Sequence, residues 1–574
     1  MSHGETSADS GDGWRALHWW PDGAVALALA IGAIVVICPT IDHYGLTYDE
    51  GWYISKAIKA RKWVGLLFED PAAALSEEGI ERYWSVAQRH ASGALMQEEQ
   101  PGAPKLVDGL PGYGLGRLFR VAFPERAGTA IFFAVALAAL YVFLAPLWGR
   151  TVAVFAAGAL FSLPRVFAHA HLCTLDVPVM SATLASAVLM FLAVVRRSIV
   201  LAALSGLAWG VGLGCKINAV FVPFVLGSWI LLMHRRFAPR AAIALLTGGL
   251  VGFLLAWPWL WRHTWSRLVE YLMFHVKHYP VAVSYFGHVS GSQPWHYPIV
   301  MTAITTPVVT LGLGVVGLVV AGRRVAERGV AAGNGRAEWR RSQCVLILVG
   351  ALVNIGLNSL PSAPKYGGVR LFLPLFPFAV SLAAIGLHAL IGAAGRVTAS
   401  SKGTLLTPRR LRIGLAVVAL LPAVRAVGLS HPYQLSYYNV LIGGTRGAVA
   451  AGMEATYWGE SYLAATNYVA ARMKPSDEVW VDLPGCEWII RQYLAPMYPN
   501  ARVTSSGWPP PTAAWAIIQN KASELSPASR ALMAFATPVY AATTADGVPL
   551  SLVYDREGIR QAEERRSGVR GTAG

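Results

Sequence analysis

The chain is poor in charged residues and in cysteines. Only 14% of its 574 residues are charged, whereas soluble globular chains average about 25%. Its five cysteines are scattered, without a CxxC pair or the spacing of a metal finger. The first 22 residues are polar and mixed in charge, so they lack the basic region of a cleaved signal peptide. These absences argue against a soluble enzyme, a disulfide framework and a thiol mechanism.

Long apolar stretches take the place of the missing charge, because 55% of the residues are hydrophobic. A segment of roughly 17–25 apolar residues can cross a bilayer core. We therefore predict an all-α polytopic membrane protein of about eleven transmembrane helices. The expected spans are 23–41, 126–147, 151–168, 175–195, 199–214, 218–233, 241–260, 299–321, 342–360, 371–392 and 411–428.

The net charge of +16 would suit a nucleic-acid partner, but the basic residues gather in short loops between the spans. Basic loops of this kind set the orientation of a membrane protein. The positive-inside rule places them in the cytoplasm, together with the N-terminal tail, residues 1–22. The transmembrane domain then covers 23–428. Its extracytoplasmic loops are 42–125 and 262–298, and a C-terminal domain follows at 429–574.

The outer segments have their own patterns. Residues 50–68 place apolar side chains opposite basic ones, as helices do that lie along a membrane surface. Residues 106–122 are interrupted by Pro111 and glycines, so we expect them to be interfacial and not to span. The C-terminal domain is expected to be small and α/β. Its predicted elements are a strand at 478–482, a helix at 487–494, a strand at 514–518 and a hairpin around Asp546-Gly547.

Asp49 and Glu50 follow the first span directly. Transfer of a group to a hydroxyl needs a base, and a carboxylate near the membrane surface can accept the proton. The same residues also fit a capping box that starts at Thr47, in which Glu50 reaches back to the Thr47 amide. Capping explains Glu50 better than Asp49, so Asp49 is the stronger candidate for the base.

A second candidate carboxylate, Asp176, lies at the outer end of the fourth span. A carboxylate there is costly unless it faces a polar cavity or a partner. An ordinary helix N-cap, with Pro178 in the first turn, explains it equally well. His169 and His171 precede it; no HExxH or DxD motif accompanies them, so they are only candidate pocket residues and no metal site is predicted from them.

Cations are expected at the same outer rim. A leaving group that gains negative charge during transfer needs positive charge beside it, although rim cations also snorkel or bind lipid head groups. The candidates are Lys105, Arg126, Lys216, Lys365 and Arg370. The loop at 262–298 is rich in aromatic residues and suits an interfacial belt or a sugar-binding surface. His275 and His278 are its candidate site residues.

Taken in order, these motifs resemble the GT-C glycosyltransferases, in the branch of the protein O-mannosyltransferases and the aminoarabinose transferase of lipid A modification. The matching pieces are Tyr48-Asp-Glu-Gly-Trp-Tyr53, Ala103-Pro-Lys-Leu106, Glu125-Arg126, Ala168-His-Ala-His-Leu-Cys-Thr-Leu-Asp-Val-Pro178, Gly214-Cys-Lys-Ile-Asn218, Lys365-Tyr-Gly-Gly-Val-Arg-Leu-Phe-Leu-Pro374, His431-Pro-Tyr-Gln-Leu-Ser-Tyr-Tyr-Asn439 and Glu454-Ala-Thr-Tyr-Trp458. The likeness covers about 40–460 and places the protein in a bacterial inner membrane.

The resemblance implies an inverting, single-displacement transfer of a sugar from a polyprenyl-phosphate carrier to a hydroxyl acceptor. On that pattern Asp49 is the base, and Glu50 and Asp176 line the pocket. Lys105, Arg126, Lys365 and Arg370 would hold the donor phosphate, and Tyr437 would lie in the pocket. Whether the site holds a divalent cation stays open, because Pro104 stands where some relatives have a metal-binding glutamate. Separately, His171 stands where the family has an arginine, so the role of that position is open as well.

Two other classes of protein compete with the glycosyltransferase. A secondary transporter suits the number of spans, but its polar residues should lie mid-membrane on broken helices, often with repeat symmetry. Here the ionisable residues gather at one rim. A non-catalytic assembly or lipid-binding protein would tolerate the loss of Asp49, whereas an enzyme would lose its turnover.

Overall fold

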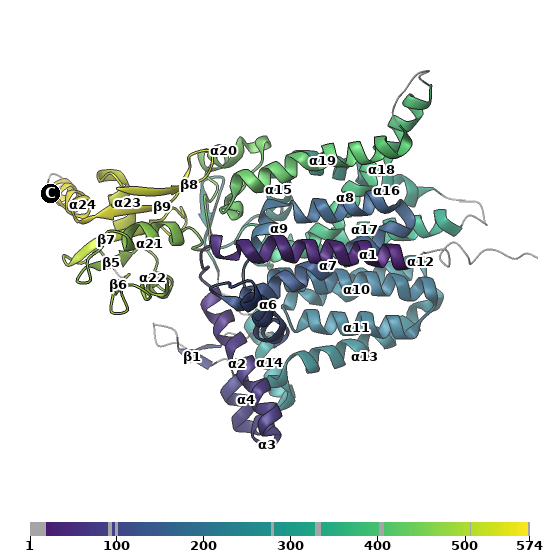
Figure 1. The fold of residues 1–574 in the computed structure, drawn as a ribbon, viewed down its shortest axis with the longest axis horizontal. Coiled ribbons are helices and arrows are strands. Elements are labelled where there is room, and N and C mark those ends of the chain that lie inside the picture. Colours follow the sequence, from purple (N-terminus) through teal and green to yellow (C-terminus); the bar gives the residue numbers. More distant parts are fainter. Residues whose placement is uncertain are drawn as a thin grey trace, which may run out of the picture.

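The structure is a computed structural model that describes residues 19–85, 87–89, 95–97, 102–276, 280–327, 335–400, 407–505 and 507–571. Most of these residues form long helices that run side by side (Figure 1). Among them, eight helical segments are long and apolar enough to cross a membrane, and three further apolar helices are shorter. The prediction of a polytopic helical membrane protein is therefore confirmed. The principal helices are α1 (Trp19–Ile37), α7 (Ala127–Trp148), α8 (Arg150–Phe161), α10 (Asp176–Arg196), α11 (Ile199–Leu213), α12 (Val222–Met233), α13 (Ala238–Ala256), α16 (Val308–Ala326), α17 (Gly335–Asn358), α18 (Phe376–Ser400) and α19 (Pro408–Ser430).

Several predicted spans are divided, and proline explains the two divisions that fall well inside a span. The stretch 151–168 contains α8 and a short α9 (Pro164–His169), since Leu163 is extended before Pro164. The stretch 299–321 is divided between α15 (Tyr297–Thr305) and α16, and Thr306 is extended before Pro307. A residue that precedes proline is sterically disfavoured in the helical region, so a helix ends there.

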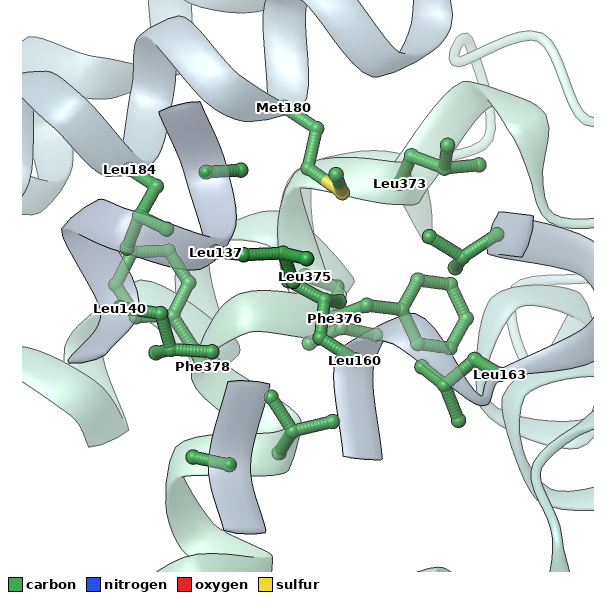
Figure 2. Packing of buried hydrophobic residues seen from close by; sticks show 14 of the residues in the cluster. Leu137, Leu140, Leu160, Leu163, Met180, Leu184, Leu373, Leu375, Phe376 and Phe378 are labelled. Carbon is green, nitrogen blue, oxygen red and sulfur yellow. The ribbon is translucent and has the colours of Figure 1, made fainter. Parts of the chain in front are cut away.

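The centre of the bundle is packed by large apolar side chains from α7, α8, α10, α18 and the segment η7 (Arg370–Leu375) (Figure 2). Leu140, Leu160 and Met180 are completely buried there, and Leu373 and Leu375 from η7 pack into the same cluster. Because close-packed side chains hold helices in fixed positions, this cluster holds the start of α10 and the start of η7 in place. Both starts carry candidate site residues.

Shorter helices lie across one end of the bundle (Figure 1). The predicted amphipathic segment at 50–68 is helix α2 (Glu50–Glu69). The predicted interfacial stretch at 106–122 consists of short helical pieces, and the described residues of this stretch contain no spanning helix. The elements of this region are α3 (Pro71–Leu75), α4 (Glu77–Trp84), α5 (Gly102–Val107), η2 (Asp108–Gly112), α6 (Tyr113–Leu118) and α14 (Thr264–Val276).

The C-terminal residues form a mixed sheet with helices on it, at the same end of the bundle (Figure 1). The strand order is β6-β5-β7-β9-β8, in which β6, β5 and β7 are parallel and β9 and β8 are antiparallel to their neighbours. The expected strand, helix and hairpin positions are all present. The elements are α20 (Gly444–Ala450), α21 (Tyr462–Ala470), β5 (Glu478–Val481), α22 (Glu487–Leu494), β6 (Arg502–Thr504), β7 (Ala513–Gln519), α23 (Pro527–Phe535), β8 (Tyr540–Thr543), β9 (Pro549–Asp555) and α24 (Arg556–Gly571).

Candidate active site

A cavity of about 540 Å³ lies where the membrane helices meet the C-terminal sheet. Its wall comes from seven separate parts of the chain: the start of α2, the start of α9, the 281–301 region, the loop before η7, the 438–458 segment, the loop after β5 and the loop after β7. The lining includes acidic side chains, basic side chains and many aromatic rings. The charged and aromatic lining residues are Tyr48, Asp49, Trp52, Arg165, Tyr297, Tyr366, Arg370, Tyr438, Glu454, Tyr457, Trp458, Lys521 and Glu524.

Glu50 and Arg126 form a closed ion pair beside this cavity, not inside it. The guanidinium of Arg126 donates to both carboxylate oxygens of Glu50 at 2.7 Å. Its remaining N–H groups donate to the carbonyls of Ile41, Tyr44 and Gly45. An arginine has five N–H donors, so all of them are engaged. Both side chains are almost completely buried.

Glu50 also fulfils the predicted capping interaction. The Thr47 amide donates to Glu50 Oε2 at 2.8 Å, and the Cys173 amide donates to Oε1 at 2.8 Å. With Arg126 on the same oxygens, neither group has capacity left for a substrate. The two residues fix the turn between α1 and α2, and thereby the position of Asp49. The phosphate role predicted for Arg126 and the pocket role predicted for Glu50 are not supported by this geometry.

Asp49, one residue earlier, faces the cavity. Its Oδ2 accepts hydrogen bonds from Arg370 Nη1 at 2.9 Å and from the indole N–H of Trp458 at 3.1 Å. Within the described ranges Oδ1 accepts none. The Asp49 side chain keeps 25% of its surface exposed, against none for Glu50. One oxygen is thus held by the protein and the other is open to a ligand.

Two guanidinium groups with unused donors line the same cavity. Arg370 Nε and Arg165 Nη1 are buried and have no hydrogen-bond partner among the residues that the structure describes. The consecutive glycines Gly367 and Gly368 separate them, both in the left-handed region, with φ of +61° and +65°. A Cβ on Gly368 would collide with Arg165 Nη1. Glycine is required here both for the backbone conformation and for the space.

Arg165 is held by aromatic side chains. Its guanidinium lies 4.6 Å from the ring centroid of Tyr438 and 5.8 Å from that of Tyr457, and its Nε donates to the Tyr437 carbonyl at 3.1 Å. Arg370 is similarly stacked 4.4 Å from the Trp458 ring centroid. Stacking on ring faces orients a guanidinium without using its N–H donors. These two arginines therefore remain able to bind an anion.

Asp176 and Lys216 pair with each other at 2.6 Å, with Asp176 buried. His169 lies next to the cavity wall: its Nε2 is 3.3 Å from the Tyr457 hydroxyl, and its ring lies 5.5 Å from that of Trp458. Burial lowers the pKa of His169 to about 4, so its imidazole is neutral at neutral pH. Asp176 and His169 stand behind the lining residues and do not themselves line the cavity.

The remaining predicted residues lie elsewhere. Lys365 Nζ donates to the carbonyls of Leu360 and Ala363, which occupies it in its own loop. Tyr437 lines a second cavity. His278 lies outside the described residues. Lys105, His171 and His275 do not line the first cavity. Lys105 is buried on α5, His171 is hydrogen-bonded to Thr40 and stacked on Tyr44, and the His275 ring packs on Tyr271.

Sequence reasoning missed Arg165 and did not single out Glu454 or Trp458. Arg165 was overlooked because the stretch 151–168 reads as one continuous apolar span. The signal that could have found it is Pro164, the residue before Arg165, because a proline indicates a break in the helix. Glu454 and Trp458 belong to a motif that was recognised by its place in the sequence. Its spacing gave no indication of a role for either side chain.

The described residues offer no ligand set for the divalent cation that the resemblance left open. No three His, Cys, Asp or Glu side chains gather closely enough within them to hold a metal ion. Asp49, which lines the cavity, and Asp176, which does not, are each paired with a cation of the protein. No step below is assigned to a metal.

Comparison with known families bears on this arrangement. Residues 119–261 match the family model described as dolichyl-phosphate-mannose-protein mannosyltransferase. The resemblance predicted from the motifs is confirmed. The matched segment contains Arg126, Arg165, Asp176 and Lys216. No curated protein matches the chain in sequence.

Several solved structures are similar to the chain. ArnT from Cupriavidus metallidurans in the apo state is 17% identical, with a TM-score of 0.49 over 96% of this chain and 98% of that one. The same protein bound to undecaprenyl phosphate gives 16% identity and a TM-score of 0.47, over 95% and 98% of the two chains. The oligosaccharyltransferase AglB from Archaeoglobus fulgidus, in complex with an inhibitory peptide and a dolichol-phosphate, is 10% identical, with a TM-score of 0.45 over 87% of this chain and 70% of that one.

Proposed function

We propose that this protein is an integral-membrane glycosyltransferase that moves a sugar from a polyprenyl-phosphate carrier to a hydroxyl acceptor at the extracytoplasmic face. The observation that carries the proposal is the pairing of an open carboxylate oxygen with unused guanidinium donors in one cavity. Asp49 supplies the first, and Arg370 and Arg165 supply the second. The family match over 119–261 supports the reaction class.

The reaction is a single displacement that inverts the anomeric centre. Asp49 Oδ1 accepts the proton of the acceptor hydroxyl as its oxygen bonds to the anomeric carbon. The bond between that carbon and the phosphate oxygen breaks on the opposite face, and the polyprenyl phosphate leaves with the electron pair. Charge-assisted hydrogen bonds from Arg370 and Arg165 stabilise the negative charge that grows on the phosphate.

Arg370 couples the two halves of this step. Its Nη1 holds Asp49 Oδ2 while its Nε remains available to the phosphate. The same planar group therefore sets the distance between the base and the leaving group. Trp458 donates to the same Asp49 oxygen through its indole N–H, and its ring also stacks on Arg370. Holding reacting groups in a fixed geometry is itself a large part of catalysis.

The extracytoplasmic location rests on the positive-inside rule. The most basic connections lie at the start of α8 and α19 and at the C-terminal end of α10, α12 and α16. Helix α2, which begins directly after Asp49, lies at the opposite end of the bundle, the end that carries the C-terminal sheet (Figure 1).

The deciding experiment incubates the purified protein with a panel of polyprenyl-phosphate sugars and measures the release of polyprenyl phosphate. We expect release with at least one donor, and we expect Asp49→Asn to abolish it without loss of fold. A correctly folded protein that cleaves none of the donors, in the presence of mixed hydroxyl acceptors, would contradict the proposal.

A further inference from the structure

Contacts group the charged lining residues of the cavity into two sets. Arg165 and Arg370 lie against Gly368 and Gly367 and are called the first, anion-binding end. Glu454 accepts from the Ser523 amide, next to the Lys521–Glu524 pair, and these three charged residues are called the second end. Lys521 is already paired with Glu524 at 2.5 Å. The second end therefore carries a net negative charge and presents acceptors of hydrogen bonds. The proposed reaction uses only the first end, together with Asp49.

Glu454 is the decisive side chain of the second end. It is 93% buried, since only 7% of its surface is exposed. Its Oε1 accepts from the amides of Ser284 at 2.9 Å and Ser523 at 3.3 Å. Its Oε2 is buried too and accepts no hydrogen bond among the described residues. Burial raises the pKa of this carboxyl, and the neighbouring Ser523 side chain opposes that rise. A buried carboxylate oxygen without a donor costs free energy, so this atom is set up for a ligand.

Three distant parts of the chain hold this carboxylate in place. Ser284 belongs to the hairpin strand β3 (Val283–Tyr285), and Ser523 follows β7 in the C-terminal sheet. The backbone carbonyl of Glu454 accepts from the Tyr438 hydroxyl at 3.0 Å, and the Tyr438 ring carries the Arg165 guanidinium. Glu454 is thus fixed relative to the anion-binding end by a short chain of contacts.

The C-terminal sheet presents its ligand-binding edge to this end of the cavity. Leu483 and Pro484 come directly after the parallel strand β5, and Lys521 and Glu524 come after its parallel neighbour β7. In open α/β sheets, ligands bind beyond the carboxyl ends of parallel strands. These are the loops that close the cavity.

We infer that Glu454 and the loops after β5 and β7 form the acceptor subsite, and that the acceptor group bound there is an uncharged carbohydrate hydroxyl and not an anionic head group. A free carboxylate oxygen attracts a hydroxyl donor and repels a phosphate. Tyr48 and Trp52 also line the cavity and are half-buried, so their rings can offer apolar faces on which a sugar ring packs. This inference rests on the proposed function, because it assigns the second substrate of that reaction.

The test measures sugar transfer from an accepted polyprenyl-phosphate donor to neutral methyl glycosides and to the matching sugar phosphates. We expect the methyl glycosides to be used and the sugar phosphates to be poor acceptors. Glu454→Gln replaces the free acceptor oxygen by an amide donor. It should raise the acceptor KM by roughly tenfold to a hundredfold, the value of a hydrogen bond to a charged group, while the donor KM stays unchanged.

Glu460→Gln is the matched control. Glu460 is also buried, and its Oε1 accepts from Thr456 Oγ1 at 2.7 Å while its Oε2 lacks a partner within the described part of the chain. It differs from Glu454 in not lining the cavity. We expect its acceptor KM to match that of the wild type. Saturation-transfer NMR of methyl α-mannopyranoside and mannose 6-phosphate on each variant gives a binding readout that is independent of turnover.

The outcomes separate the two proposals. If the wild-type protein transfers sugar but Glu454→Gln keeps the wild-type acceptor KM, or if both glutamate variants change equally, the acceptor subsite is wrong and the transferase stands. Preference for the sugar phosphates would also overturn the subsite. If no donor is cleaved by the folded wild-type protein, the proposed function itself fails and the subsite fails with it.

Discussion

Asp49 and Glu50 are neighbours in the sequence, carry the same charge and each pair with an arginine, yet their surroundings differ completely. Glu50 and Arg126 saturate each other and the adjoining backbone, away from solvent. Asp49 and Arg370 each keep a polar atom without a protein partner beside a cavity. An acid–arginine pair is therefore structural or chemical according to the donors and acceptors it leaves unused, and not according to its residue types.

Asp49→Asn should have the largest effect. It removes the base while keeping the shape, so we expect turnover to fall by roughly 10²–10⁴. The Arg370 side chain is mostly buried and loses its charged partner, so the variant should also lower the free energy of unfolding by about 1–3 kcal/mol. Donor cleavage and thermal unfolding of the same preparation measure both quantities. Full turnover in this variant would remove Asp49 from the mechanism.

Arg126→Met should act on folding instead. It leaves Glu50 charged and buried without a cation, which costs about 3–5 kcal/mol. Thermal unfolding in detergent should show the loss, and the double variant with Glu50→Gln should regain part of it. A stable Arg126→Met protein with a raised donor KM would instead restore the phosphate role that the sequence suggested.

Arg165→Lys tests the newly recognised cation. A lysine keeps the charge, but it lacks the planar guanidinium that stacks on the Tyr438 ring and at the same time donates hydrogen bonds to a phosphate. We expect the donor KM to rise about tenfold, which corresponds to about 1.4 kcal/mol. Lys365→Met is the comparison, because Lys365 serves only loop carbonyls among its described contacts, and its donor KM should stay near the wild-type value.

Asp482 extends the comparison to a buried acid without a cation. Its carboxylate accepts only from the Tyr462 hydroxyl and the Gln519 amide among the described residues, and burial raises its pKa to about 7. In the unfolded chain the pKa of an aspartate is about 3.9. Between about pH 4 and pH 7 the folded protein therefore binds one proton at Asp482 that the unfolded chain does not bind. Stability should therefore fall by at most about 1.4 kcal/mol per pH unit from pH 4 to 7 and stay level above.

Unfolding of the C-terminal domain followed against pH measures this slope, and Asp482→Asn should flatten it. An unchanged slope in the variant would assign the pH dependence to other groups.

The spans and the C-terminal elements could be predicted because each follows from a local pattern. Hydropathy marked the helices, and the strand and turn signals around 478–482 and Asp546-Gly547 were sufficient for the sheet. The divided spans were missed because hydropathy averages over a proline such as Pro164.

The site was only partly predictable, because it depends on which partners each charge acquires. Asp49 was found by its position after the first span. The phosphate role of Arg126 stays a prediction that its geometry does not support. Residues 41–50 already accept from its guanidinium, and a sequence does not show that these donors are used. Arg165 lay unnoticed in an apolar stretch. Pairing of this kind is a tertiary property that residue type and spacing do not encode.

The loops after β5 and β7 close the cavity without contributing to the anion-binding end. Under the proposed function, changes in these two short connections of the C-terminal sheet would alter which acceptor is modified, while Arg165 and Arg370 would continue to bind the same carrier. Exchanging those connections between related chains offers a direct route to redirecting such a catalyst.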